Sequence, residues 1–108
     1  MVEQLLRGPL RSYALGLRWF AVRYLTGKGV IRSGHRAVYR RFAEFLDSRA
    51  VELRQSLEAG RCPFCGRSFS SQSSLRGHLF ASRGCYSRLV EYVDSLVWEY
   101  VTTYVAPS

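Results

Sequence analysis

Four residues in the middle of the chain carry side chains that bind soft metal ions, and their spacing lets them reach one ion. They follow the pattern Cys-x2-Cys-x12-His-x6-Cys and are Cys62, Cys65, His78 and Cys85. Zinc prefers nitrogen and sulfur ligands in a tetrahedron, and a site with four protein ligands has a structural role because no position is open. The sequence therefore predicts a structural zinc site, with iron as the main competitor.

Cysteine usage supports this interpretation. The chain has only three cysteines, and the pattern uses all of them. An odd number of cysteines argues against a disulfide framework. The alternative is that three buried free cysteines and an unrelated histidine happen to share this segment.

Two apolar residues between the ligands extend the motif to Cys-x2-Cys-x3-Phe-x5-Leu-x2-His, with Phe69 and Leu75 at the apolar positions. Residues 62–85 thus resemble the Cys2His2-type zinc-finger family, in a variant with cysteine as the fourth ligand. The resemblance implies a short hairpin near residues 61–70 and a helix over residues 71–82. It implies Ser70 or Ser71 as the helix N-cap.

The segment departs from the family at both ends. Gly60 stands where the family usually has an aromatic residue. The last ligand follows the histidine at a longer interval than the family's usual spacer of about three to five residues. We expect Gly84 to end the helix in a left-handed conformation and to bring Cys85 back to the metal.

In the family, the finger helix enters the DNA major groove and a few side chains on its leading face touch bases. The positions that match are Ser71, Ser73, Ser74 and Gly77. Serine discriminates little between bases and glycine has no side chain, so this helix reads sequence poorly. Arg67, Arg76 and Arg83 suit phosphates instead.

Positive charge is concentrated in two blocks. The net charge is +8; residues 1–43 carry nine basic groups against Glu3, and residues 61–88 carry five arginines and no acid. All basic residues except Lys28 are arginine. Arginine binds phosphate bidentately, so this usage favours a nucleic-acid partner, although a GC-rich genome produces the same bias.

Apolar periodicity predicts three longer helices around the finger, over residues 10–25, 35–57 and 86–104. We expect one mainly α domain over residues 1–108, with a ββα zinc finger embedded at 60–86. A strand over residues 97–105 is the alternative for the last segment. Trp19 is expected to be buried, with contact to a partner as the alternative, and Trp98 fits either a contact site or the edge of the core.

Three arginines, Arg36, Arg40 and Arg41, crowd the start of the second predicted helix. Positive charge is unfavourable at a helix N-terminus, and a bound phosphate is one way to offset it. We therefore predict that these arginines share one basic surface with Arg67 and Arg76. The alternative is that the two basic groups lie on opposite sides of the domain.

These features predict a zinc-finger protein that binds nucleic acid, in particular a DNA-binding transcriptional regulator with mainly phosphate contacts; RNA is a further candidate ligand. The alternative is a zinc-stabilised protein-interaction module that binds a protein or a second copy of itself through Trp19 or Trp98. No catalytic constellation is apparent, so an enzyme is not expected.

The same features bear on location. No apolar run is long enough for a membrane span and the start lacks the features of a signal peptide. We expect an intracellular protein, cytoplasmic if prokaryotic or viral and nuclear if eukaryotic. In style the chain is similar to small single-finger proteins of viruses that infect heat-loving archaea.

Overall fold

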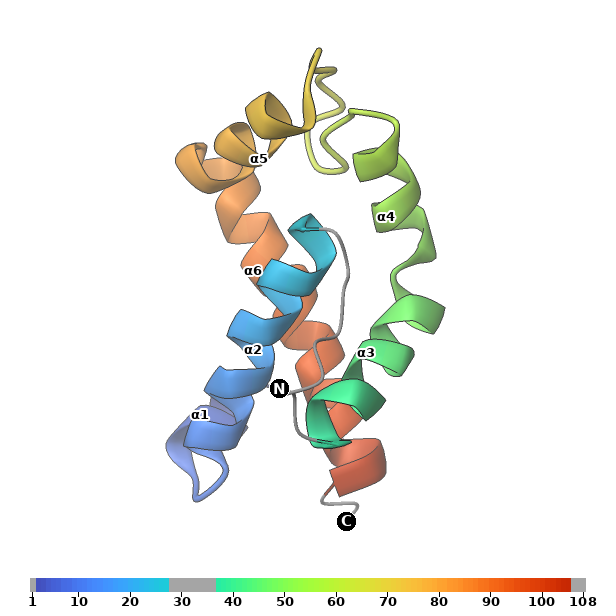
Figure 1. Ribbon diagram of the computed structural model, residues 1–108. Helices are drawn as coiled ribbons and strands as arrows, with labels where there is room; N and C mark the ends of the chain where they lie inside the picture. The colour runs from blue at the N-terminus through green and yellow to red at the C-terminus, as the bar shows by residue number, and fades with distance from the viewer. Residues whose placement is uncertain (1, 28–36, 106–108) are drawn as a thin grey trace.

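A computed structural model describes residues 2–27 and 37–105, and this part of the chain is mainly helical. Two antiparallel helices form its centre: α2 (Arg11–Thr26) and α6 (Arg83–Tyr100). A short helix, α1 (Val2–Arg7), precedes α2, and α6 continues into a π-helical turn at Val101–Val105. Figure 1 shows that α6 runs the length of the molecule, from the end that carries α5 (Gln72–Ala81) to the opposite end beside α1.

The core lies where α2, α3 (Ala37–Arg49) and α6 meet. Its central side chains are apolar and fully buried: Leu17, Ala21, Phe42, Leu46, Val93 and Val97. Each fully buried large side chain contributes about 1.5–3 kcal/mol. None of these central side chains is a predicted metal ligand, although Cys62 and Cys85 belong to the same continuous core. The helical body therefore has apolar contacts of its own.

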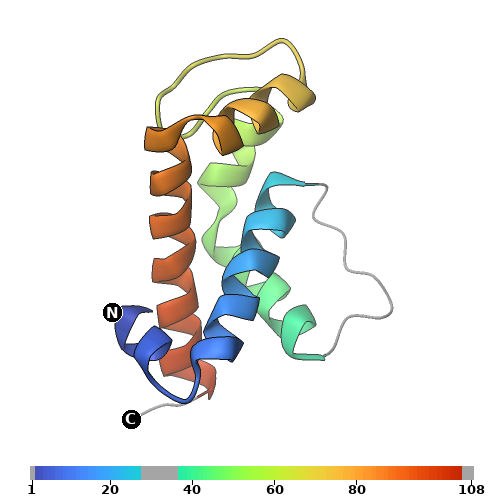
Figure 2. The ribbon, with the colours of Figure 1, turned by 90° about the vertical axis from the view of Figure 1, so that its left-hand side faces the viewer.

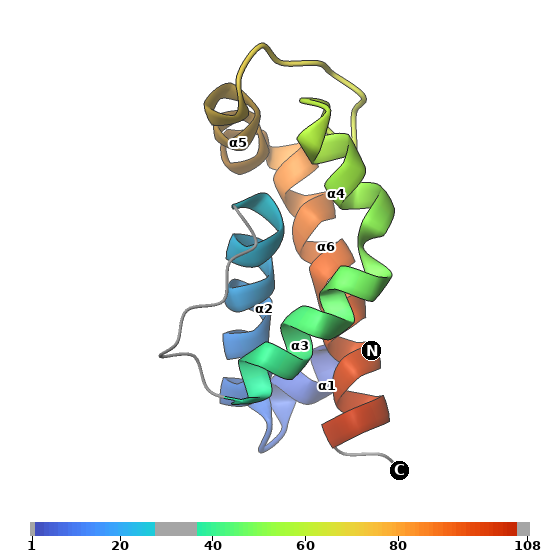
Figure 3. The ribbon, with the colours of Figure 1, turned by 45° about the vertical axis from the view of Figure 1, so that its right-hand side comes forward.

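The second predicted helix is present but broken. α3 ends at Arg49 and α4 (Val51–Glu58) begins two residues later, with Ala50 between them at φ −104° and ψ 32°. Figure 3 shows the resulting bend. Because Ala50 is fully buried, the bend lies against the core. It lets α3 pack on α2 and α6 while α4 reaches α5.

The predicted ββα finger is wrong. Within the described residues there is no strand; the expected hairpin is reduced to one isolated antiparallel bridge between Arg61 and Ser68. Two further backbone bonds hold this loop, from Cys62 N to Arg67 O and from Phe69 N to Gly60 O. The segment is thus a loop closed by a few hydrogen bonds, within a described structure that is otherwise mainly helical.

The helix predicted over residues 10–25 is confirmed as α2, and the finger helix is confirmed as α5. The strand alternative for residues 97–105 is wrong, because these residues complete α6 and the π-helical turn. Sequence reasoning missed α1.

Candidate metal centre

The structure brings the four predicted ligands together in a cluster compatible with metal binding. Their ligand atoms all lie within 4.8 Å of one another. Cys62 Sγ lies 3.7 Å from Cys85 Sγ, and Cys65 Sγ lies 3.5 Å from His78 Nε2. Cys62 and Cys85 are buried, His78 is half-buried and Cys65 is exposed. The cluster therefore lies at the edge of the core with one side open to solvent.

A tight turn positions the first two ligands. The backbone N–H of Gly66 donates to the carbonyl of Cys62 over 2.9 Å, and Gly66 has a φ of +78°. This left-handed conformation suits glycine, which has no Cβ to clash with the backbone. The turn places both thiols on the same side of the loop, as one metal ion requires.

The two thiols of the turn differ electrostatically. Burial raises the pKa of the Cys62 thiol, although backbone N–H groups of Cys65 and Phe64 act in the opposite direction. The pKa of the Cys65 thiol is lowered, chiefly by a hydrogen bond from the backbone N–H of Arg67. Backbone N–H groups aimed at sulfur stabilise thiolates, the form in which cysteine binds metals.

Phe69 orients the histidine ligand. Its ring centroid lies 4.8 Å from that of His78 at an interplanar angle of 36°. The Arg67 guanidinium lies over the Phe69 ring, 5.6 Å from its centroid. The predicted apolar position of the motif thus packs against a ligand, and Leu75, at 1% exposed, fills the core beneath it.

One residue, Ser82, separates the helices that carry the last two ligands. It is the C-cap of α5 and the N-cap of α6, with φ −80° and ψ 117°, and its hydroxyl accepts from Cys85 N. His78 lies in the last turn of α5 and Cys85 in the first turn of α6. The long interval between the ligands therefore spans a corner between two helices.

The prediction for Gly84 is wrong for the same reason. Gly84 lies inside the first turn of α6, and among the described residues only Gly60 and Gly66 have positive φ. The extended backbone of Ser82 ends α5 instead. By contrast, the predicted N-cap is confirmed at Ser71, whose hydroxyl accepts from Ser74 N over 3.1 Å.

Gly60 also has a structural explanation. Its φ is +77°, and a Cβ at this position would lie 3.0 Å from the carbonyl oxygen of Phe69. A side chain would thus be strained by the backbone and crowded by the bridge. This geometry explains why an aromatic residue is absent from this position.

Side-chain contacts attach the loop that carries Cys62 and Cys65 to the helical body. Gln72 Nε2 donates to Leu57 O over 2.9 Å and joins α5 to the end of α4. Arg88 donates to Phe64 O over 2.9 Å and joins α6 to the loop. The cluster is therefore part of the domain rather than a separate finger.

The predicted nucleic-acid contacts near the cluster are exposed. Arg67 lies on the loop, Arg76 on α5 and Arg83 at the start of α6. Ser71 and Ser74 are exposed as well, but their hydroxyls bond each other over 2.9 Å. Because Ser71 also caps α5, these two hydroxyls already have protein partners.

The structure does not join the second basic group to the first. Arg40 and Arg41 lie in the first two turns of α3, at the opposite end of the molecule from α5 (Figure 1). Arg41 lines a groove of about 960 Å³ there, together with Tyr13, Tyr100 and Tyr104. Arg36 lies outside the described residues. Arg40 and Arg41 therefore lie far from Arg76 along the molecule, and one continuous surface that links them to Arg67 and Arg76 stays a prediction.

One of the two tryptophans differs from expectation. Trp19, predicted to be buried, is 42% exposed, whereas its neighbour along the edge, Val22, is buried. Trp98 is half-buried. Trp19 thus exposes a larger fraction of its side chain to solvent than Trp98 does.

Comparison with known protein families, curated proteins and solved structures finds no match to this chain. Fold and site alone therefore define its class: a mainly helical domain with a Cys3His cluster compatible with metal binding. Within the described ranges, no helix combines the length and the apolar character needed to cross a membrane.

Proposed function

We propose that the Cys3His cluster holds one zinc ion and that the domain which this ion stabilises binds nucleic acid. The metal identity is supported by geometry and by donor type. Zn–S and Zn–N bonds of about 2.3 and 2.0–2.1 Å require tetrahedral edges of about 3.8 Å between sulfurs and about 3.6 Å between sulfur and nitrogen. Two of the six separations, 3.7 and 3.5 Å, are close to these values, and all six are at most 4.8 Å.

Four protein ligands leave zinc no open coordination position, so the ion has a structural role. It would join the loop before α5, α5 itself and the start of α6, since each contributes at least one ligand. The chemistry that zinc supplies here is the neutralisation and fixing of thiolates. An enzyme is not proposed.

One observation carries the nucleic-acid proposal: the segment around the cluster has exposed arginines and no acid. Residues 61–88 contain five arginines and neither aspartate nor glutamate. Arg67, Arg76 and Arg83 are exposed around α5. Such a surface favours a polyanion, and arginine matches the geometry of phosphate. The finer prediction, a DNA-binding transcriptional regulator, rests on the motif resemblance.

A protein-interaction module is the second candidate, and one observation favours it. Trp19 and Phe80 are 42% and 45% exposed. Aromatic side chains are enriched at protein interfaces, where they often carry much of the binding energy. In that case zinc would shape a docking surface for a protein.

Binding measurements on duplex DNA, single-stranded DNA and RNA over a range of salt concentrations test the proposal. With three to five phosphate contacts, the slope of log K against log salt on duplex DNA should be about −3 to −4.5. Arg76→Ala and Arg83→Ala should each flatten it by about one unit. Arg7→Ala, on α1 at the other end of the molecule, is the matched control. Absence of binding to every nucleic acid at low salt would contradict the proposal and favour the interaction module.

A further inference from the structure

An exposed surface formed by α2, α5 and α6 combines aromatic rings with arginines. We name it the Trp19–Phe80 surface, and it consists of Trp19, Arg23, Arg76, Phe80, Arg83 and Tyr86. Trp19 and Phe80 are 42% and 45% exposed, the three arginines are exposed and Tyr86 is half-buried. In Figure 2 the three helices lie toward the viewer, with α3 and α4 behind them.

Contacts between α2, α5 and α6 bring these residues together. Arg76 Nε donates to Thr26 O over 3.2 Å, so α5 meets the C-terminal end of α2. Phe80 follows Arg76 by four positions and therefore lies on the same side of α5. The Phe80 ring centroid lies 6.0 Å from that of Tyr86 on α6. Arg83 precedes Tyr86 by one helical turn.

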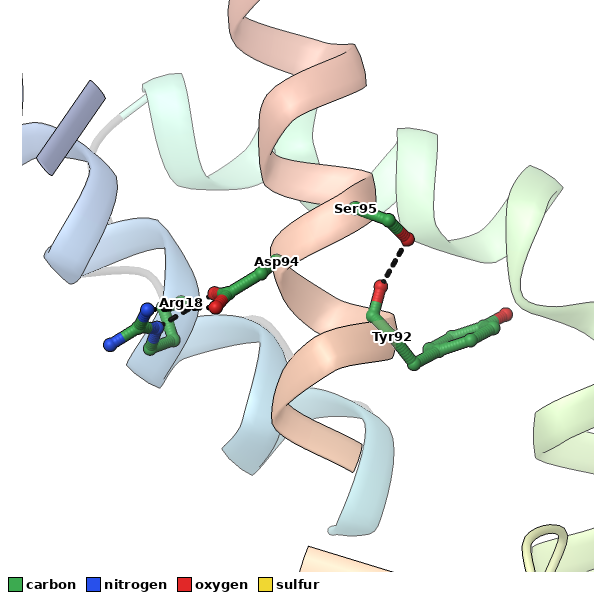
Figure 4. A network of polar contacts seen from close by, with 4 residues as sticks. All are labelled: Arg18, Tyr92, Asp94 and Ser95. Carbon is green, nitrogen blue, oxygen red and sulfur yellow. Dashed lines mark hydrogen bonds and ion pairs between the residues drawn. The ribbon is translucent and has the colours of Figure 1, made fainter. Parts of the chain in front are cut away.

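Arg18 connects α6 back to Trp19. Its guanidinium carbon lies 5.9 Å from the centre of the Trp19 ring. Asp94 holds Arg18 through two bonds of 2.7 Å, as Figure 4 shows. Trp19 thus has a fixed cationic neighbour and still exposes much of its surface. Arg23 follows Trp19 by four positions on α2 and lies on the same side.

The charge of this surface has one sign. Neither α2 nor α5 contains an acidic residue, and the first acid of α6 is Glu91, two turns after Arg83. Asp94 is neutralised by Arg18. The surface is therefore complementary to a polyanion that also offers flat aromatic groups.

Single-stranded nucleic acid has this combination. Its bases are free to stack on aromatic side chains while its backbone follows arginines, whereas a duplex hides the base faces within its own stack. We infer that the Trp19–Phe80 surface binds single-stranded nucleic acid, with bases on Trp19 and Phe80 and phosphates on Arg23, Arg76 and Arg83. This inference rests on the proposed nucleic-acid function and specifies the form of the ligand.

Fluorescence anisotropy with the zinc-loaded full chain tests this inference. The probes are a labelled oligothymidine of about 15 nucleotides and a duplex of the same length. Trp19→Ala and Phe80→Ala should each weaken binding of the single strand about 5- to 100-fold, since each base stack contributes that much. Binding of the duplex should change by less than about twofold, because phosphate contacts remain.

Two controls separate stacking from general effects. Tyr104→Ala removes an aromatic side chain that is 63% exposed at the opposite end, and it should leave single-strand affinity unchanged. Arg7→Ala controls for the loss of one charge. Circular dichroism and zinc content establish that each variant is folded. In a Trp98→Phe background Trp19 is the sole tryptophan, and its fluorescence should change on adding the single strand.

Three results would overturn the inference. The first is single-strand binding that is unaffected by both Trp19→Ala and Phe80→Ala; the second is duplex binding without single-strand binding. Both leave the proposed function intact. The third is no binding of any nucleic acid at low salt, which also removes the proposed function and indicates that the aromatic side chains of this surface contact a protein.

Discussion

Cys62 Sγ lies 3.7 Å from Cys85 Sγ, so the loop after α4 and the first turn of α6 meet at one point. Both thiols are buried. Because α6 extends from this point to the opposite end of the molecule, a metal held here would fix the loop to the longest helix of the domain.

Treatment with a chelator should destabilise the end of the domain that carries the Cys3His cluster and leave the helical body folded. The loop of residues 59–71 has few backbone hydrogen bonds, whereas α2, α3 and α6 are joined by buried apolar side chains that are not ligands. In hydrogen–deuterium exchange, amides of residues 60–82 should exchange faster while those of α2 and the second half of α6 stay protected. Global unfolding, or no change in any segment, would contradict this prediction.

Gly60→Ala should lower the free energy of unfolding by about 1–3 kcal/mol, because it places a Cβ at positive φ and close to Phe69 O. Gly77→Ala is the matched control. A Cβ at Gly77 meets open space inside α5, so alanine should stabilise the protein by about 0.5–1 kcal/mol. Chemical denaturation of the zinc-loaded protein measures both. Equal effects of the two substitutions would mean that Gly60 is not conformationally required.

The Arg18–Asp94 ion pair should contribute more to stability than the Arg49–Glu99 pair. Side chains of the first pair are 17% and 13% exposed, and those of the second 51% and 41%. Asp94→Asn should lower the free energy of unfolding by about 1.5–3 kcal/mol, and Glu99→Gln by at most about 1 kcal/mol. Thermal unfolding of the two variants gives the comparison, and a larger effect from Glu99→Gln would refute it.

Alkaline pH should destabilise the fold through its buried tyrosines. Burial is the main cause that raises the pKa of Tyr13, Tyr24, Tyr92 and Tyr100. When the folded pKa exceeds the unfolded value of about 10, the neutral phenol stabilises the fold below that pH, and the contribution is lost as pH rises through the folded pKa.

Tyr24→Phe isolates one of these groups. It removes the hydroxyl that donates to Asp47 over 3.0 Å, so the variant should be less stable at neutral pH by about 0.5–1.5 kcal/mol. It should also lose less stability than wild type between about pH 9 and 12. Tyrosinate absorbance and circular dichroism follow ionisation and unfolding together. An identical pH profile for both proteins would show that the fold does not raise the pKa of Tyr24.

Local chemistry made part of this structure predictable. The ligand set follows from residue type and spacing, α2 from apolar periodicity, and the Ser71 cap from the hydroxyl that α5 needs at its first turn. The features that could not be predicted from the sequence depend on long-range packing. Neither the buried break at Ala50 nor the pairing of Arg18 with Asp94, 76 positions away, is visible in a local pattern.

Residues 62–85 show how much of a structure a spacing motif can predict. Spacing predicts that the four ligand atoms meet. The backbone between His78 and Cys85, however, depends on Ser82, which begins a new helix at the position where the family resemblance implies only the end of the finger helix. The same corner places Phe80 and Tyr86 beside each other on one surface. Trp19 is exposed although burial was expected; the arginines at positions 18 and 23 were the available signal.

Native mass spectrometry of the intact protein at neutral pH tests the central claim most directly, that Cys62, Cys65, His78 and Cys85 hold one structural zinc ion. We predict one zinc per chain in the wild type and none in a Cys65→Ser, Cys85→Ser double variant, with Tyr104→Ala retaining the ion as control. Wild-type protein that stays free of metal with zinc in excess, and whose three thiols all react with an alkylating reagent, would contradict it.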